Sequence, residues 1–64
     1  MENKQWNPEA CWKVQFLNRT DYTFETREVQ APNELVAQHF AWNALMNEGF
    51  RAEWLSHVKT ERVE

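Results

Sequence analysis

The sequence has few of the residues that reinforce a small domain or build common ligand sites. Among its 64 residues there is one cysteine, Cys11, and one glycine, Gly49. A single cysteine excludes an internal disulfide and a thiolate metal cluster. A single glycine excludes a glycine-rich phosphate-binding loop. The fold must therefore rest on apolar packing, alone or with a partner, and four Trp and four Phe residues supply the large rings for it.

An excess of positive charge is also missing. Seven Lys and Arg against ten Asp and Glu give a formal net charge of −3. Proteins that grip phosphates need a positive field, so we expect no direct binding to nucleic acid. No apolar run approaches the roughly 20 residues that span a bilayer, and the polar start does not resemble a signal peptide. These features indicate a cytoplasmic protein with no membrane partner.

Recognisable catalytic and metal-binding motifs are absent as well. His39 and His57 belong to different predicted elements, and no His or Cys pair has zinc-ligand spacing. Ser56 has no base at a recognisable spacing, and the scattered carboxylates form no acid–base pair. The sequence therefore predicts a protein that is not an enzyme and holds no cofactor or metal.

Alternating apolar residues predict a β-hairpin in the first half of the chain. Residues 11–17 place Trp12, Val14 and Phe16 on one face, and residues 22–30 form a second strand after a short turn. The second strand changes parity between its first and last residues, so we expect a bulge near Arg27 or Glu28.

A helix and a third strand are predicted to follow. Asn33 is a good N-cap, residues 35–48 contain no helix breaker, and Gly49 suits the left-handed C-cap position. Residues 50–58 alternate again. The expected fold is a single α+β domain over residues 1–64, with flexible tails at 1–9 and 60–64. Its β-β-α-β order gives a three-stranded antiparallel sheet, in strand order 2-1-3, with the helix on one face.

The predicted helix has two apolar sides. The side rich in alanine is expected to pack on the sheet because small residues allow a close approach; it consists of Ala37, Phe40, Ala41 and Ala44. On the sheet, the expected core residues are Trp12, Phe16, Phe24, Phe50 and Trp54. Leu35, Trp42 and Met46 lie nearly opposite on the helix. Three interpretations stay open: Trp6 covers them, the helix is rotated from this phase, or they bind a partner.

Three segments resemble a known family. They are Cys11-Trp12-Lys13-Val14, residues 25–31 and Glu48-Gly49-Phe50. Over residues 11–59 the chain resembles the small early proteins of podoviruses that inhibit bacterial RNA polymerase. The resemblance implies a protein partner, with basic residues after the Gly-Phe pair gripping the polymerase. Here Arg51 and Lys59 flank that stretch while Trp54 and Ser56 occupy its middle, which puts the target in doubt.

The candidate function is therefore binding of another protein, with steric inhibition of a host enzyme such as RNA polymerase as the leading mechanism. The candidate partner-binding residues form two sets. One is the helix cluster of Leu35, Trp42 and Met46. The other is expected on the open face of the sheet and contains Lys13, Glu25, Arg51, Leu55, His57 and Lys59.

Two alternatives accompany this function. One is a mimic of nucleic acid that uses Glu25, Glu28, Glu53 and Glu61 as surrogate phosphates, although interleaved Lys and Arg residues argue against a dense negative stripe. The other is a homodimer that hides the second apolar side of the helix.

Overall fold

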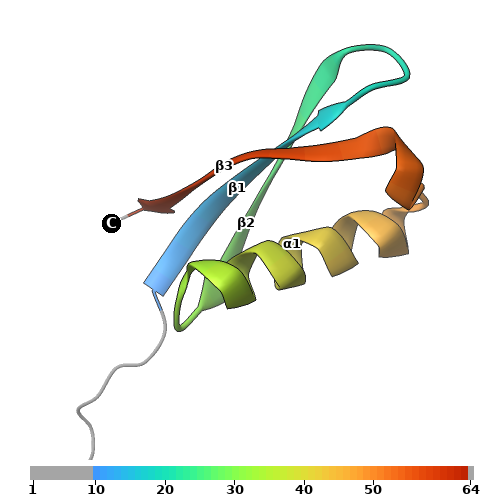
Figure 1. The fold of residues 1–64 in the computed structure, drawn as a ribbon. Helices are drawn as coiled ribbons and strands as arrows, with labels where there is room; N and C mark the ends of the chain where they lie inside the picture. The colour runs from blue at the N-terminus through green and yellow to red at the C-terminus, as the bar shows by residue number, and fades with distance from the viewer. Residues whose placement is uncertain (1–9, 64) are drawn as a thin grey trace, which may run out of the picture.

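A computed structural model describes residues 10–63 and shows a three-stranded antiparallel sheet with one helix on one face (Figure 1). The strand order β2-β1-β3 confirms the fold predicted from the sequence. In chain order the elements are β1 (Ala10–Asn18), β2 (Thr23–Ala31), α1 (Glu34–Glu48), the 3-10 helix η1 (Ala52–Trp54) and β3 (Leu55–Val63). The predicted N-terminal tail and Trp6 lie outside the described residues.

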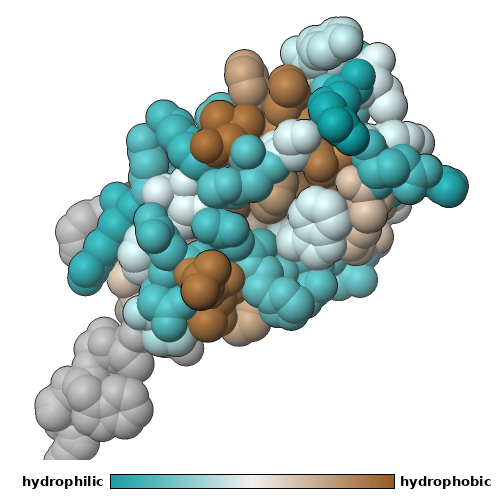
Figure 2. Space-filling model, viewed as in Figure 1, coloured by the Kyte–Doolittle hydropathy of each residue, from teal (hydrophilic) through white to brown (hydrophobic). Residues whose placement is uncertain are grey.

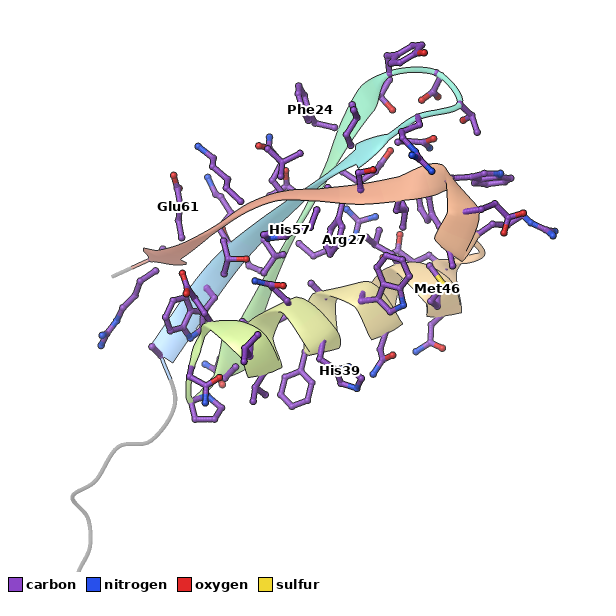
Figure 3. The ribbon with its side chains drawn as sticks, viewed as in Figure 1. Phe24, Arg27, His39, Met46, His57 and Glu61 are labelled. Carbon is purple, nitrogen blue, oxygen red and sulfur yellow. The ribbon has the colours of Figure 1, made fainter. Side chains whose placement is uncertain are left out.

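The hairpin of β1 and β2 has a continuous register. Every residue from Ala10 to Asn18 pairs with one residue of β2, so the expected bulge near Arg27 or Glu28 does not exist. Without a bulge, Phe24 keeps the parity that points it away from α1, and its side chain is 60% exposed. Its predicted place in the core is therefore wrong. Figure 3 shows Phe24 on the side of the sheet opposite to the helix.

The third strand begins later than the sequence indicates. Residues 50–54 form a connection that includes η1, and β3 starts at Leu55 and continues to Val63. Thr60–Val63 is thus paired with β1, where the sequence predicts a fraying tail. The bulge of this sheet lies in β3, because Gln15 pairs with Lys59 and Phe16 with His57, leaving Val58 without a partner on β1.

Both ends of α1 are capped as the sequence predicts. The Asn33 side chain accepts a hydrogen bond from the Val36 amide at 3.0 Å. At the other end Gly49 adopts φ 108°, and its amide donates to the carbonyls of Leu45 and Met46. Each cap satisfies backbone groups that the helix itself leaves unpaired.

The core lies between α1 and the face of the sheet that it covers. Its fully buried members on the helix are Ala37, Ala41 and Leu45, spaced four residues apart. The buried members on the sheet are Val14, Phe16, Ala31 and Leu55. Trp12, Phe50 and Trp54, also predicted to be core, are half-buried and pack against this cluster.

The phase of α1 differs from the prediction. Phe40 and Trp42 lie about 100° from Ala41 in opposite directions around the helix, so periodicity alone does not decide which packs inward. Phe40 is 43% exposed, whereas Trp42 and Met46 pack against the core. The rotated helix, one of the three open interpretations, is the observed one for these two residues. The reason is that the Phe16 ring lies on the Trp42 side.

Candidate functional site: a groove between α1 and β3

A pocket of about 310 Å³ opens between the helix and the third strand, and we call it the α1–β3 groove. It exists because Ala37 and Ala41 hold α1 close to the sheet along one line while large side chains stand beside that line. The residues that line the groove are Phe16, Leu35, Gln38, His39, Trp42 and His57. In Figure 3, His57 projects from β3 toward the helix and Met46 lies near the C-terminal end of α1.

Three rings form the floor of the groove. The Phe16 ring, only 2% exposed, has its centroid 5.8 Å from that of Trp42, with 51° between the ring planes. On its other side the His57 ring meets it edge-on, at 5.7 Å and 73°. Tilted and edge-to-face arrangements are favourable for aromatic pairs. Phe16 of β1 and Trp42 of α1 therefore supply an apolar surface, and His57 of β3 adds a polar ring at its edge.

The rim of the groove combines one apolar side chain with polar ones. Leu35 is 75% exposed. His57 Nε2 lies 2.8 Å from Thr60 Oγ1, so this hydrogen bond fixes the orientation of the ring. Among residues 10–63, no Lys, Arg, Asp or Glu lines the groove. The groove thus presents apolar side chains together with the amide of Gln38 and the imidazoles of His39 and His57.

The predicted helix cluster is only partly reproduced. Leu35 and Trp42 line the same groove, but Trp42 is half-buried because it also packs on the core. Met46, one turn further along α1, packs against the core and is not a lining residue. Three residues of the groove were not predicted from the sequence to bind a partner: Phe16, Gln38 and His39. The spacing of Leu35, Gln38, His39 and Trp42 is the available signal, since residues three to four apart share a helix side.

The predicted patch on the open face of the sheet does not form. Lys13 and Lys59 do lie on that face. Glu25 and His57 do not, because they pair with Phe16, which points toward α1. Leu55 is 6% exposed and belongs to the core. This correction follows from the missing bulge in β2 and the bulge at Val58.

Arg51, the last predicted patch residue, lies before β3 begins. Its Nε donates to Glu53 Oε2 at 3.2 Å, and both side chains are well exposed. The pair belongs to the connection around η1 and is not part of the sheet.

The charged groups form local pairs at the surface. Arg27 lies between the sheet and α1 (Figure 3) and donates from Nε to Glu48 Oε2 at 2.8 Å. This hydrogen bond lowers the pKa of Glu48 and raises that of Arg27. A hydrogen bond from Lys59 likewise lowers the pKa of Glu61.

The four carboxylates suggested as surrogate phosphates do not form a stripe. Glu25, Glu53 and Glu61 each lie within 4.0 Å of a basic side chain. Glu25 lies on the side of the sheet that faces α1, and Glu28 and Glu61 lie on the opposite side. Nothing in this arrangement favours mimicry of nucleic acid.

Apolar side chains also reach the surface outside the groove. Figure 2 shows brown side chains separated by teal ones over this view of the molecule. The large exposed apolar residues are Tyr22, Phe24, Leu35, Phe40 and Val58. Leu35 is the member of this set that lines the α1–β3 groove.

Within residues 10–63, no three His, Cys, Asp or Glu side chains are grouped so that they would hold a metal ion. In the same part of the chain, no helix has the length and apolar character needed to cross a membrane. Comparison with known proteins gives no match to a protein-family model, to a curated protein or to a solved structure.

Proposed function

We propose that this chain is a non-enzymatic protein-binding module that docks on its partner through the α1–β3 groove. The observation that carries this proposal is the half-buried Trp42 ring, which packs on the buried Phe16 and lines the groove beside the 75% exposed Leu35. Recessed aromatic rings with an exposed apolar rim are what an interface anchor needs, since hot spots are enriched in such desolvated pockets. Occupation of the groove would also cover apolar surface that water now contacts.

The groove favours one kind of partner segment. Its volume of about 310 Å³ accommodates a single large apolar side chain from a partner. Gln38, His39 and His57 line the same space, and their side chains offer donors and acceptors for polar groups beside such an anchor. We therefore propose an apolar anchor residue, flanked by backbone or polar side-chain groups, as the element that docks.

Bacterial RNA polymerase is the partner to test first, on the resemblance to podovirus early proteins alone. In that case the chain is a phage-encoded inhibitor in the cytoplasm of a bacterial host, and it blocks a functional surface of the enzyme sterically. The residues that line the groove support a binding role. Within residues 10–63 they include two imidazoles but no Ser, Cys or carboxylate to act as a nucleophile or a paired acid.

A matched pair of variants tests the groove. Leu35→Glu introduces a charge at the rim, and Phe40→Glu introduces the same charge on α1 outside the groove. We expect Leu35→Glu to weaken partner binding by about 2 kcal/mol, roughly 30-fold, as loss of an interface anchor does. Phe40→Glu should bind within a factor of about three of the parent.

Binding is measured by biolayer interferometry with immobilised chain, first against bacterial RNA polymerase and then against any protein captured from bacterial lysate. Circular dichroism melts establish that both variants are folded. Equal loss of binding in both variants, or no loss in Leu35→Glu, would remove the groove as the docking site.

A further inference from the structure

The outer edge of β3 is free along the described chain. β3 pairs with β1 on one side only, and within residues 10–63 no other strand pairs with its second edge (Figure 1). An edge strand presents backbone N–H and C=O groups that are ready to pair with another strand. β3 is nine residues long, which is long enough to add a neighbour.

One row of directly opposite residues on the open face of the sheet alternates in charge and ends at the free edge of β3. Lys13 on β1 lies directly opposite Glu28 of β2 and opposite Glu61 of β3. The row therefore reads negative, positive, negative from β2 to β3. Figure 3 shows Glu61 projecting from the sheet on the side away from α1. A positive side chain beyond Glu61 would continue the row, because opposite charges facing each other across strands are stabilising.

We propose that a second copy of this chain supplies that charge by pairing its β3 antiparallel to β3 about Thr60. In this register Lys59 faces Glu61 of the partner subunit, and Glu61 faces Lys59 of the partner subunit. The two contacts are identical by symmetry, as a two-fold interface requires. Thr60 faces its own copy at the axis, and Thr–Thr pairs are favourable in sheets.

Neighbouring registers are disfavoured by charge. The two helices stay on the same face of the joint sheet only if the two-fold axis passes through a residue and not between two residues. The neighbouring registers are therefore those centred on Lys59 and on Glu61. Centring on Lys59 places two lysines opposite each other, and centring on Glu61 does the same with two glutamates. The sequence around Thr60 therefore selects one register.

The edge of β2 is less suited to the same pairing. A two-fold register about Thr26 would ask Arg27 to meet Glu25 of a partner subunit. Arg27 already binds Glu48 of α1 and lies 3.8 Å from Glu25 of its own strand. Its guanidinium is thus committed within the chain. Lys59 also lies 3.0 Å from Glu61 of its own strand, but its side chain is 56% exposed, against 27% for Arg27, and it borders the free edge, where it can exchange this partner for Glu61 of a second copy.

The paired strands bring two grooves together. The two-fold axis runs perpendicular to the sheet, so both copies of α1 lie on the same face of a six-stranded sheet. His57 and Thr60 from both copies form the middle of the depression between the helices. The bulge at Val58 limits the regular ladder to the residues around Thr60. We therefore expect a weak dimer in exchange with monomer. The pairing stands whether or not the groove binds another protein.

Charge exchange at the edge tests the register. Sedimentation equilibrium of the full chain should show the average mass rising toward two chains between about 10 μM and 1 mM. Lys59→Glu puts like charges opposite each other twice, and so does Glu61→Lys; each should weaken association by about tenfold or more. The double variant K59E/E61K should associate as the parent does.

Mixing the two single variants is the sharpest measurement. In a heterodimer, two glutamates of one chain face two lysines of the other, so the 1:1 mixture should associate more tightly than either variant alone. Arg51→Glu and Glu53→Lys make the same charge changes on exposed side chains outside β3. The 1:1 mixture of these two control variants should associate only slightly more tightly than either control alone.

Three results would overturn the pairing. A chain that is monomeric at 1 mM excludes it. Association unaffected by Lys59→Glu excludes the register. Heterodimers that form no better than those of the control mixture show that net charge, and not the edge, governs association. Circular dichroism melts of each variant confirm that the compared chains are folded.

Discussion

Two leucines of α1 occupy opposite extremes of burial. Leu45 is fully buried, and Leu35 is 75% exposed at the rim of the groove. Both belong to one helix, so the same truncation has the same effect on helix propensity at both positions. Their comparison isolates the contribution of packing.

We predict that Leu45→Ala lowers the free energy of unfolding by about 2 to 5 kcal/mol, because it leaves a cavity in the core. Leu35→Ala should lower it by less than about 1 kcal/mol. Urea denaturation followed by circular dichroism measures both. Similar losses in the two variants would mean that the groove is closed over Leu35.

The ion pair between Arg27 and Glu48 gives the fold a sensitivity to acid. Arg27 donates a hydrogen bond to Glu48 and thereby lowers the pKa of that carboxyl below its ordinary value of 4.5. The unfolded chain consequently binds a proton at Glu48 more readily than the folded chain does. The contribution of the pair is present above the ordinary pKa and is lost as the pH falls through the lowered one.

We predict that Glu48→Gln flattens the fall in melting temperature between about pH 5 and pH 3. The melting temperatures of parent and variant should converge at the acidic end of that window. Glu53→Gln is the control, since Glu53 is also paired at the surface but by a neighbour two residues away. A parallel pH profile for Glu48→Gln and the parent would contradict the assignment.

At the scale of elements, the end of α1 depends on one backbone conformation. Gly49 has φ 108°, which side chains rarely adopt, although a Cβ there would meet no atom within 4 Å. The cost of substitution is therefore conformational and not steric.

We predict that Gly49→Ala destabilises the protein by about 1 kcal/mol and Gly49→Asn by clearly less, because Asn tolerates the left-handed region better. Thermal denaturation of the three proteins decides this. Equal stability of Gly49→Ala and the parent would show that the helix ends in another way in solution.

Element order, strand order and both helix caps follow from local patterns and were predictable from the sequence. Asn33 and Gly49 mark their positions by chemistry that needs no tertiary context. The phase of α1 was not predictable in the same way. Phe40 and Trp42 flank Ala41 symmetrically, and only the ring of Phe16 decides between them.

The candidate site was less predictable than the fold because it depends on strand parity. One unpaired residue, Val58, changes which side chains of β3 face the helix. A single bulge reverses a period-two pattern, and alternation alone does not locate it. Leu35 and Trp42 were singled out from the sequence, whereas the contribution of His57 to the groove required the observed register.

At the scale of the whole molecule, several charged side chains of residues 10–63 form local pairs, and the groove residues of this part include no Lys, Arg, Asp or Glu. Within residues 10–63, acidic and basic side chains lie on both faces of the sheet and give no single-signed field. Binding through the groove should therefore depend little on ionic strength.

We predict that affinity for a partner bound in the groove changes by less than about tenfold between roughly 50 and 500 mM salt, since screening acts mainly on charged contacts. Isothermal titration over this range measures the dependence, and a mimic of nucleic acid would lose far more. A steep salt dependence would contradict docking through the groove and would indicate that charged residues make the main contacts with the partner.

The central strand of the sheet, β1, is the first in the chain. Its two neighbours in the sheet lie at very different distances from it along the sequence. β2 follows β1 after a short turn, whereas β3 reaches β1 only after the helix and η1. Pairing of β1 with β2 closes a short loop, whereas pairing with β3 closes a loop that contains β2, α1 and η1. Contacts between residues close in sequence cost less entropy to form, so we expect the hairpin to precede the docking of β3. Until β3 docks, Val14 and Phe16 lack their neighbours on one side, and a folding intermediate would expose them at an open edge of β1.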